Sequence, residues 1–516
     1  MPTFAFVVLG VALCYIYDVR AYTDEAMKDK VASLPRSENL EIDNFGFSGY
    51  LDIDGSEPGS KHMHYWFFES ANDPVNDPVA FWTNGGPGCS GLLGAMTEQG
   101  PFWPQADGML ATNQYAWNNN ANMVFVEQPC GVGFSYSSAN DTKADYTSND
   151  MSAAKDYFTM IEKWLERFPE YAANDLYLTS ESYGGHYLPT LAKYIVDYGA
   201  GGNTALNGNF RGFMVGNPAT DMYSTTPAML DTWWGHQLLP KPLYDTWTKK
   251  CGTWAGKIAN AEECETTFLR MYMATSSLNP YALDYGTCLD DSRSSTVRKS
   301  KTSKRTSKMR SSQAKRLLHH HLKHEGWLSE RGLQAIKMGT IDPEAEPSYD
   351  ACIGDYLTDF LNDPEVKAAL HVNQKIKWGD CSYAVDYSIV DSELKNTAPI
   401  YSYLMENNDK FNINILVYSG DDDSVCGTIG TQSWIYDLGF DTRFGKEWVE
   451  WFVYDQLAGY FAQFDGAGKK LAFATVHNAG HEVPTYTPAA ALGLFQAYLS
   501  KSIFSDDKRE ADLTPK

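Results

Sequence analysis

Short apolar runs alternate with longer amphipathic segments along two parts of the chain, from about residue 44 to 217 and again from about residue 349. Apolar runs of this length between turn-forming residues are typical of buried strands, and the pattern of residues 150–168 is helical. Strands that alternate with helices predict an α/β fold built on a central sheet. The predicted strands are residues 79–82, 123–126, 176–178, 413–418 and 471–476.

The intervening residues, 219–348, follow a different pattern. They contain helical segments at 232–234 and 261–274 but no strong strand. We therefore predict that 219–348 is a helical cap inserted into an α/β core, and that the core consists of residues 22–218 and 349–516.

One segment of the predicted cap is strongly basic. Residues 293–323 hold 11 Lys and Arg and no Asp or Glu. Such a run is typical of a solvated loop, and its Lys304-Arg305 and Lys315-Arg316 pairs make it a candidate for proteolytic excision. His319, His320, His321 and His324 could bind a metal, but a histidine tract in a loop is weak support, and we predict no metal site.

The overall charge narrows the class of partner. The 516 residues include 42 Lys and Arg against 65 Asp and Glu, which gives a net charge of −23. This balance argues against a nucleic-acid-binding protein, which needs clustered basic residues facing phosphates. A net negative charge suits a protein that acts in an acidic medium. The charge does not decide whether the chain forms a homodimer, which remains possible.

The N-terminus resembles a secretory signal peptide. Residues 3–17 are apolar and uncharged, and Val19 and Ala21 place small residues three and one before a possible cleavage point. A membrane anchor is the alternative, but the run is shorter than the ~20 residues of a spanning helix. Removal of residues 1–21 predicts a protein with no membrane segment, in an acidic lysosome-like or vacuole-like compartment or outside the cell. Asn140 begins the only Asn-x-Ser/Thr sequon, a candidate glycosylation site.

The most specific local signal surrounds Ser182. A strand leads into Ser180-Glu181-Ser182-Tyr183-Gly184 and a helix is expected from about residue 186, the context of a nucleophile elbow. Small residues are needed on both sides of the serine because the backbone doubles back tightly. Gly184 meets this need, whereas Ser180 replaces the usual first glycine. A plain strand-to-helix turn is the alternative.

A base and an acid follow in the order that this fold requires. Three consecutive aspartates, 421–423, come after the strand 413–418, and His481 comes after the strand 471–476. Serine, aspartate and histidine at the carboxyl ends of successive strands predict a catalytic triad.

With these residues the chain closely resembles the serine carboxypeptidases, an α/β-hydrolase family with a mostly parallel sheet and helices on both faces. The resemblance covers nearly all of the chain after the signal. It implies the triad Ser182, Asp423 and His481, and so selects the last of the three aspartates. The matching blocks are residues 82–90, 127–137, 181–183, 418–423 and 480–484.

The resemblance also implies a substrate site. The backbone N–H groups of Gly86 and Tyr183 would form the oxyanion hole. The free carboxylate of a peptide substrate would be bound by Asn84, Gly85, Glu98 and Glu181. Two glutamates facing a carboxylate require at least one proton between them, so we expect peptidase activity to be greatest at acidic pH.

Glu482 follows the histidine where many relatives have methionine. The resemblance places Glu482 beside the pocket for the leaving C-terminal residue, where a carboxylate would favour Lys or Arg. Relatives of the carboxypeptidase D type, which accept basic C-terminal residues, resemble this chain at that position. An exposed glutamate without contacts is the alternative.

Eight cysteines remain after the signal, and the resemblance implies how six of them pair: Cys89 with Cys381, Cys251 with Cys264, and Cys288 with Cys352. Cys130 and Cys426 would then be free thiols near the pocket, or inert buried residues. No cofactor is expected. Two other functions stay open: an acyltransferase of the same family, which transfers the acyl group to an alcohol, and a non-catalytic protective or binding protein.

Overall fold

The computed structural model describes residues 22–40, 44–200, 206, 208–251, 261–276, 278–288, 349–388, 396–465, 470–505 and 511–515. The predicted signal peptide, the basic segment 293–323 and the histidine tract lie outside these ranges. No helix within them is long and apolar enough to cross a membrane.

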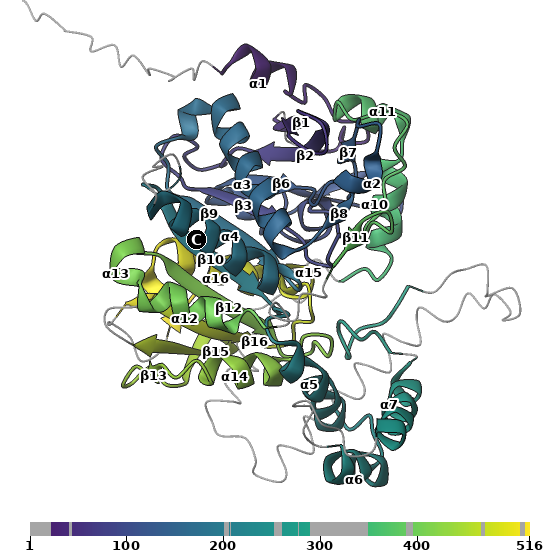
Figure 1. The fold of residues 1–516 in the computed structure, drawn as a ribbon, viewed down its shortest axis with the longest axis vertical. Coiled ribbons are helices and arrows are strands. Elements are labelled where there is room, and N and C mark those ends of the chain that lie inside the picture. Colours follow the sequence, from purple (N-terminus) through teal and green to yellow (C-terminus); the bar gives the residue numbers. More distant parts are fainter. Residues whose placement is uncertain are drawn as a thin grey trace, which may run out of the picture.

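A single large twisted sheet forms the centre of the molecule (Figure 1). Its six central strands, β6, β3, β9, β10, β12 and β16, run parallel to one another. The strands at both edges are mostly antiparallel. In spatial order the main path is β1 (Phe47–Ile53), β2 (Lys61–Phe68), β6 (Asn122–Val126), β3 (Val79–Thr83), β9 (Leu176–Glu181), β10 (Phe210–Gly216), β12 (Asn414–Gly420), β16 (Lys470–Val476), β15 (Gln456–Asp465), β14 (Val449–Val453) and β17 (Ala511–Asp512), with β7 (Tyr136–Ser137) paired to β2 and β13 (Asp441–Thr442) to β15.

Helices cover both faces of the sheet. They are needed there because successive side chains of the central strands point to opposite faces and those on both faces are apolar. In β12, Ile415 and Val417 belong to one apolar core, while Leu416 and Tyr418 belong to the core on the opposite face. The first core is completed by helices α3 (Asp150–Arg167), α4 (Gly184–Ala200), α12 (Ala398–Glu406) and α14 (Thr428–Tyr436). The second is completed by α10 (Ile353–Leu361), α11 (Pro364–Ala369) and α16 (Pro488–Leu499). The described shorter helices are α1 (Asp24–Lys28), α2 (Thr142–Asp145), α13 (Asn408–Phe411) and α15 (Val483–Tyr486). This is the α/β-hydrolase fold predicted from the sequence.

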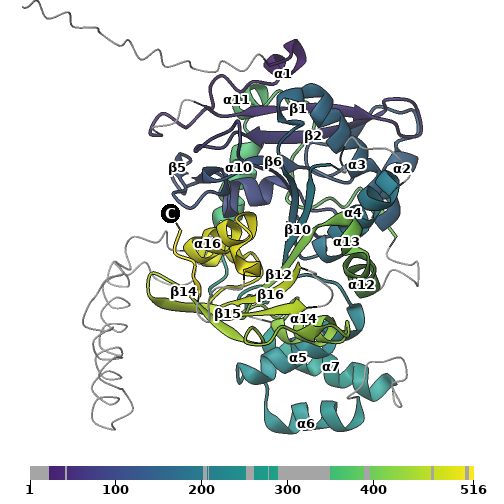
Figure 2. The ribbon, with the colours of Figure 1, turned by 90° about the vertical axis from the view of Figure 1, so that its left-hand side faces the viewer.

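Among the described residues between β10 and α10, three helices stand apart from the sheet at one end of the molecule (Figures 1 and 2). They are α5 (Met222–Gly235), α6 (Lys241–Lys250) and α7 (Ala261–Thr275), and they share a small core around Trp233 and Trp247. The predicted segment 232–234 is therefore the end of a longer helix. These helices fall inside the predicted cap 219–348, whose boundaries stay a prediction.

The strands predicted from apolar runs form the parallel centre of the sheet. The edge strands β1, β2, β14 and β15 and the central strand β10 were missed. Polar residues or glycines interrupt the apolar positions in each of them, as Arg211 and Gly212 do in β10. The exposed side of an edge strand carries residues such as Asp52 and Glu450, which weaken the sequence signal.

Candidate active site

Ser182 lies in a sharp turn between β9 and α4. Its φ of 58° is in the left-handed region, as expected for a nucleophile elbow, and its backbone N–H donates to the carbonyl of Gly216 at the end of β10 (2.9 Å). Gly184 is required here because a Cβ at that position would lie 2.1 Å from Oγ of Ser180. Ser180 itself fits the turn, since its hydroxyl donates to the carbonyl of Thr83 (2.6 Å).

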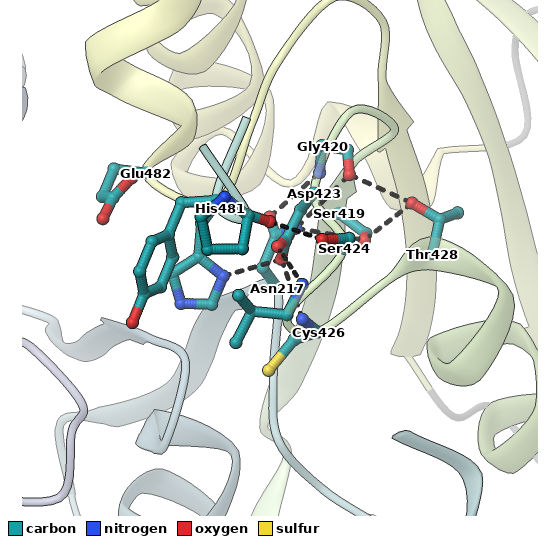
Figure 3. A network of polar contacts seen from close by, with 12 residues as sticks. Asn217, Ser419, Gly420, Asp423, Ser424, Cys426, Thr428, His481 and Glu482 are labelled. Atoms are coloured by element: carbon teal, nitrogen blue, oxygen red, sulfur yellow. Dashed lines mark hydrogen bonds and ion pairs between the residues drawn. The ribbon is translucent and has the colours of Figure 1, made fainter. Parts of the chain in front are cut away.

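His481 and Asp423 are paired. His481 Nδ1 lies 2.6 Å from Oδ2 of Asp423, and both side chains are buried. The same carboxylate accepts hydrogen bonds from Nδ2 of Asn217 (2.8 Å) and from the backbone N–H groups of Val425 (2.7 Å) and Cys426 (3.1 Å). Figure 3 shows Asn217 and His481 meeting at this carboxylate. Four donors around one carboxylate stabilise its ionised form.

Burial and charge act in opposite directions on His481. Burial disfavours the imidazolium, but the carboxylates of Asp423, Glu482 and Glu98 favour it, and together they raise the pKa of His481 to about 9. Its Nε2 atom is buried and has no hydrogen-bond partner. The hydroxyl of Ser182 takes part in none of the hydrogen bonds among the described residues. Nε2 of His481 and the hydroxyl of Ser182, which a triad joins by a hydrogen bond, are thus both free. In active sites this hydrogen bond commonly tightens only when substrate is bound.

The three consecutive aspartates face different histidines. Asp421 Oδ2 lies 2.7 Å from Nδ1 of His477, on the exposed side of the loop. Asp422 Oδ1 lies 3.8 Å from Nδ1 of His236. Of the three, Asp423 has the shortest contact and reaches His481. The structure thereby distinguishes three residues that spacing along the chain could not separate.

The glycine-rich loop after β3 passes directly over the elbow. A Cβ at Gly85 would lie 2.4 Å from the backbone nitrogen of Tyr183 and 2.8 Å from Cβ of Ser182, so only glycine permits this approach. In the described part of the chain, neither the N–H of Gly86 nor that of Tyr183 donates to a protein acceptor. Two unused N–H groups beside a serine are what an oxyanion hole requires.

Buried contacts hold this loop and the elbow in place. Ser90 donates to the buried carboxylate of Glu127, and Cys89 is bonded to Cys381. On the other side, Asp150 at the start of α3 accepts from the hydroxyl of Tyr183 (3.0 Å) and lies 2.9 Å from Nδ1 of His186.

Asn84 connects two buried glutamates. Its Nδ2 donates to Oε1 of Glu98 (3.0 Å) and to Oε1 of Glu181 (2.8 Å), while its Oδ1 accepts from Nε1 of Trp82 (2.8 Å) and the N–H of Gly94 (3.1 Å). The second oxygen of each glutamate is buried without a partner. Burial raises the pKa of Glu98, and burial together with the charge of Glu98 raises the pKa of Glu181. The pair can therefore carry a proton where an isolated glutamate would not.

These residues line a pocket of about 210 Å³ that Glu482 also lines. Oε2 of Glu482 accepts from the hydroxyl of Tyr486 (3.3 Å), and burial raises the pKa of Glu482. Glu482 therefore faces the pocket and is not an exposed residue without contacts. The remaining lining residues are mainly aromatic or apolar and include Leu93, Tyr281, Tyr349 and Ile353.

A segment that the sequence analysis missed crosses the Asp423 and His481 loops. The carbonyl of Tyr281 accepts from the N–H of His481 (2.7 Å), and the Tyr281 ring packs 5.0 Å from the imidazole. The N–H of Ser424 donates to Pro280, and that of Leu283 donates to Asp422. No motif marks residues 280–285, because their role depends on backbone groups that any sequence carries.

The structure joins Cys89 to Cys381, Cys251 to Cys264, and Cys288 to Cys352. Cys130 and Cys426 are free and buried. Burial raises the pKa of Cys130 to about 12 and that of Cys426 well above its usual value, so both stay as thiols. Asn140 is exposed and its Nδ2 donates to Glu57 (3.0 Å).

Comparison with known proteins agrees with this geometry. The family described as serine carboxypeptidase matches residues 36–501. The chain is 32% identical over 481 residues to serine carboxypeptidase-like 25 of Arabidopsis thaliana, covering 92% of each chain. It is 30% identical over 504 residues to serine carboxypeptidase 24 of the same plant, covering 96% of this chain and 97% of the relative.

Among solved structures, Kex1(Δ)p of Saccharomyces cerevisiae, a prohormone-processing carboxypeptidase, aligns with a TM-score of 0.67 at 20% identity. The alignment covers 92% of this chain and 96% of that one, and it supports the fold.

Proposed function

This chain belongs to the serine carboxypeptidase family, and we propose that it releases C-terminal amino acids from peptides and proteins through an acyl-enzyme intermediate. The observation that carries the proposal is the pocket in which Asn84, Glu98 and Glu181 lie together beside the elbow. A pocket closed by protonated carboxyl groups suits the terminal carboxylate of a substrate.

In the proposed reaction Ser182 attacks the scissile carbonyl while Nε2 of His481 takes its proton. The oxyanion that forms is stabilised by the N–H groups of Gly86 and Tyr183. The imidazolium then gives the proton to the leaving nitrogen, the C–N bond breaks, and the C-terminal amino acid departs. Water, deprotonated by His481, hydrolyses the ester of Ser182. Asp423 stabilises the imidazolium in both halves of the reaction.

Binding of the terminal carboxylate would depend on protonation. A group whose pKa is raised stays neutral up to that higher pH, so Glu98 and Glu181 can donate hydrogen bonds to a carboxylate in acidic and neutral solution. As they ionise, repulsion replaces the hydrogen bonds. This supports an enzyme whose substrate binding weakens as the pH rises.

Glu482 supports a preference for basic leaving residues. Its carboxylate lines the same pocket. The ammonium group of a C-terminal Lys or the guanidinium group of a C-terminal Arg would form an ion pair with it. Tyr281 and Tyr349 would pack against the aliphatic part of such a side chain.

Two alternative functions differ from a carboxypeptidase in the site that they need. An acyltransferase of this family would use the same triad but would not need a carboxylate-binding pocket, and the contacts of Asn84 favour the peptidase. A non-catalytic protein would have no reason to retain a paired Asp423 and His481 beside two unused N–H groups.

The remaining expectations fit this function and are part of the proposal. Residues 219–348 would be a cap inserted into the core, with a basic segment that can be excised while Cys288–Cys352 keeps the two sides joined. An acidic compartment of the secretory pathway or the cell exterior would be its site of action, with a glycan on the exposed Asn140.

The experiment that tests the proposal measures release of the C-terminal residue from two peptides that differ only in ending with Arg or Leu, at about pH 5. We expect release by the wild type and none above background by Ser182→Ala. Activity retained in Ser182→Ala, or no release by folded wild-type protein, would contradict the proposal.

A further inference from the structure

Asp422, the middle residue of the three consecutive aspartates, has no part in the proposed reaction. Its surroundings are nevertheless unusual for a carboxylate. Asp422 is 3% exposed, and its Oδ1 atom is buried without a hydrogen-bond partner. Its Oδ2 atom accepts from the backbone N–H of Asp284 (3.0 Å). A buried carboxylate oxygen without a donor is costly, so its surroundings call for an explanation.

Two further ligand-type side chains lie near this carboxylate. His236 Nδ1 lies 3.8 Å from Oδ1 of Asp422, which is too far for a hydrogen bond. One ligand atom of each of His236, Asp284 and Asp422 falls within 4.8 Å of the others. The three residues come from the end of α5, from the segment 280–285 and from the loop after β12, so the cluster does not arise from neighbours in sequence.

From this geometry we propose that His236, Asp284 and Asp422 bind one divalent transition-metal ion of the zinc type. One imidazole and two carboxylates match zinc ligands, and a site with three protein ligands leaves a position for water. Ligand atoms bonded at about 2.0–2.2 Å to a tetrahedral ion lie about 3.4 Å apart, close to the separation of His236 and Asp422.

An ion at this site would join three segments next to the catalytic loop. Asp422 directly precedes Asp423, and its carbonyl accepts from the N–H of Leu283. His236 is partly exposed and Asp284 is exposed, so the site is open to solvent on one side. Binding would stabilise the loop that carries Asp423 without using any residue of the proposed triad.

The test is a titration of the full-length protein with Co²⁺ and then Zn²⁺ at about pH 7, where an ordinary imidazole is neutral and carboxylates are ionised. Because the chain also carries His319–His321 and His324, the parent protein for this experiment has glutamine at those four positions. The readouts are the visible absorption of bound Co²⁺, its displacement by Zn²⁺, and the melting temperature.

We expect one equivalent of Co²⁺ to bind to the parent and Zn²⁺ to raise its melting temperature. His236→Gln and Asp284→Asn, both at accessible positions, should each weaken binding by at least about tenfold and abolish the rise. His477→Gln is the matched control, since His477 contacts Asp421, the neighbour of Asp422, from the loop after β16 and lies outside the cluster. No saturable binding by the parent, or equal binding by His236→Gln, would overturn the proposal and leave only a His236–Asp422 ion pair.

Discussion

Asn217 donates a 2.8 Å hydrogen bond to Oδ2 of Asp423, the same oxygen that lies 2.6 Å from His481. Asn217 follows Gly216 at the end of β10, and the carbonyl of Gly216 accepts from the N–H of Ser182. The short segment Gly216-Asn217, where β10 ends, is thus bonded both to the proposed nucleophile and to the proposed acid. It sets their relative position although neither residue is near it in sequence.

Removal of the Asn217 side chain should lower turnover more than binding. Asn217 has a positive φ of 39°, so Asn217→Gly deletes the amide without adding backbone strain. The variant loses the hydrogen bond to the charged Asp423 and also the acceptor of the Gly420 N–H (2.9 Å), which helps to hold the same loop. This loss should lower kcat by about ten- to a hundredfold and leave KM nearly unchanged. Steady-state kinetics check this, and a rise in KM with unchanged kcat would speak against a role through Asp423.

Glu482 should influence the acidic limb of the pH profile. Its charge helps to raise the pKa of His481, and a raised pKa keeps the imidazole protonated and inactive up to a higher pH. Glu482→Gln removes that charge, so the pKa of His481 should fall and the acidic limb of kcat should move to lower pH. The measurement is kcat from about pH 4 to 10 for both proteins, a range that includes the pKa of about 9 of His481. A limb that does not move would show that Glu482 and His481 are uncoupled.

The same residue should determine which C-terminal residue is preferred. Glu482→Met replaces a pocket carboxylate with an apolar side chain of similar length. We expect the ratio of kcat/KM for Arg-ending over Leu-ending peptides to fall by about tenfold or more, as for loss of one charge-assisted pair. An unchanged ratio would mean that Glu482 does not contact the leaving residue.

The tight packing of the elbow predicts that one substitution impairs the protein and that a second substitution compensates for it. In Gly184→Ala the new methyl group would meet Oγ and Cβ of Ser180, so both activity and melting temperature should fall. In the double variant Ser180→Gly, Gly184→Ala both of those atoms are gone, and the nearest remaining atom is Cγ2 of Val215, at an ordinary 3.5 Å.

We therefore expect the double variant to recover melting temperature and activity relative to Gly184→Ala. Thermal unfolding and peptide hydrolysis together check it. A double variant as impaired as Gly184→Ala would show that the clash with Ser180 is not the cause.

The parts of this site that the sequence predicts are those with local signals. The elbow around Ser182 combines an apolar strand, small residues and a helix, and all of that information lies within about ten residues. The central strands are apolar on both faces because both faces are covered by helices. Such buried strands are readable without knowledge of their partners.

Other parts of the site depend on contacts between distant segments. The π-helical turn Gly94–Glu98 aims Glu98 at Asn84, but nothing in its composition indicates a widened helix. Residues 280–285 reach the catalytic loops through backbone hydrogen bonds, which leave no residue pattern. Spacing along the chain does not choose among the three aspartates either; the family resemblance implied Asp423, and the three residues face different histidines.

The most direct test of the central claim compares one peptide as a free acid and as its C-terminal amide, with wild type, Asn84→Ala and Ser182→Ala. The measured quantity is kcat/KM for release of the last residue at about pH 5. We predict strong preference of the wild type for the free acid, a reduction of that preference by about tenfold or more in Asn84→Ala, and no activity in Ser182→Ala. Equal cleavage of acid and amide by the wild type would contradict recognition of a terminal carboxylate and hence the proposed carboxypeptidase.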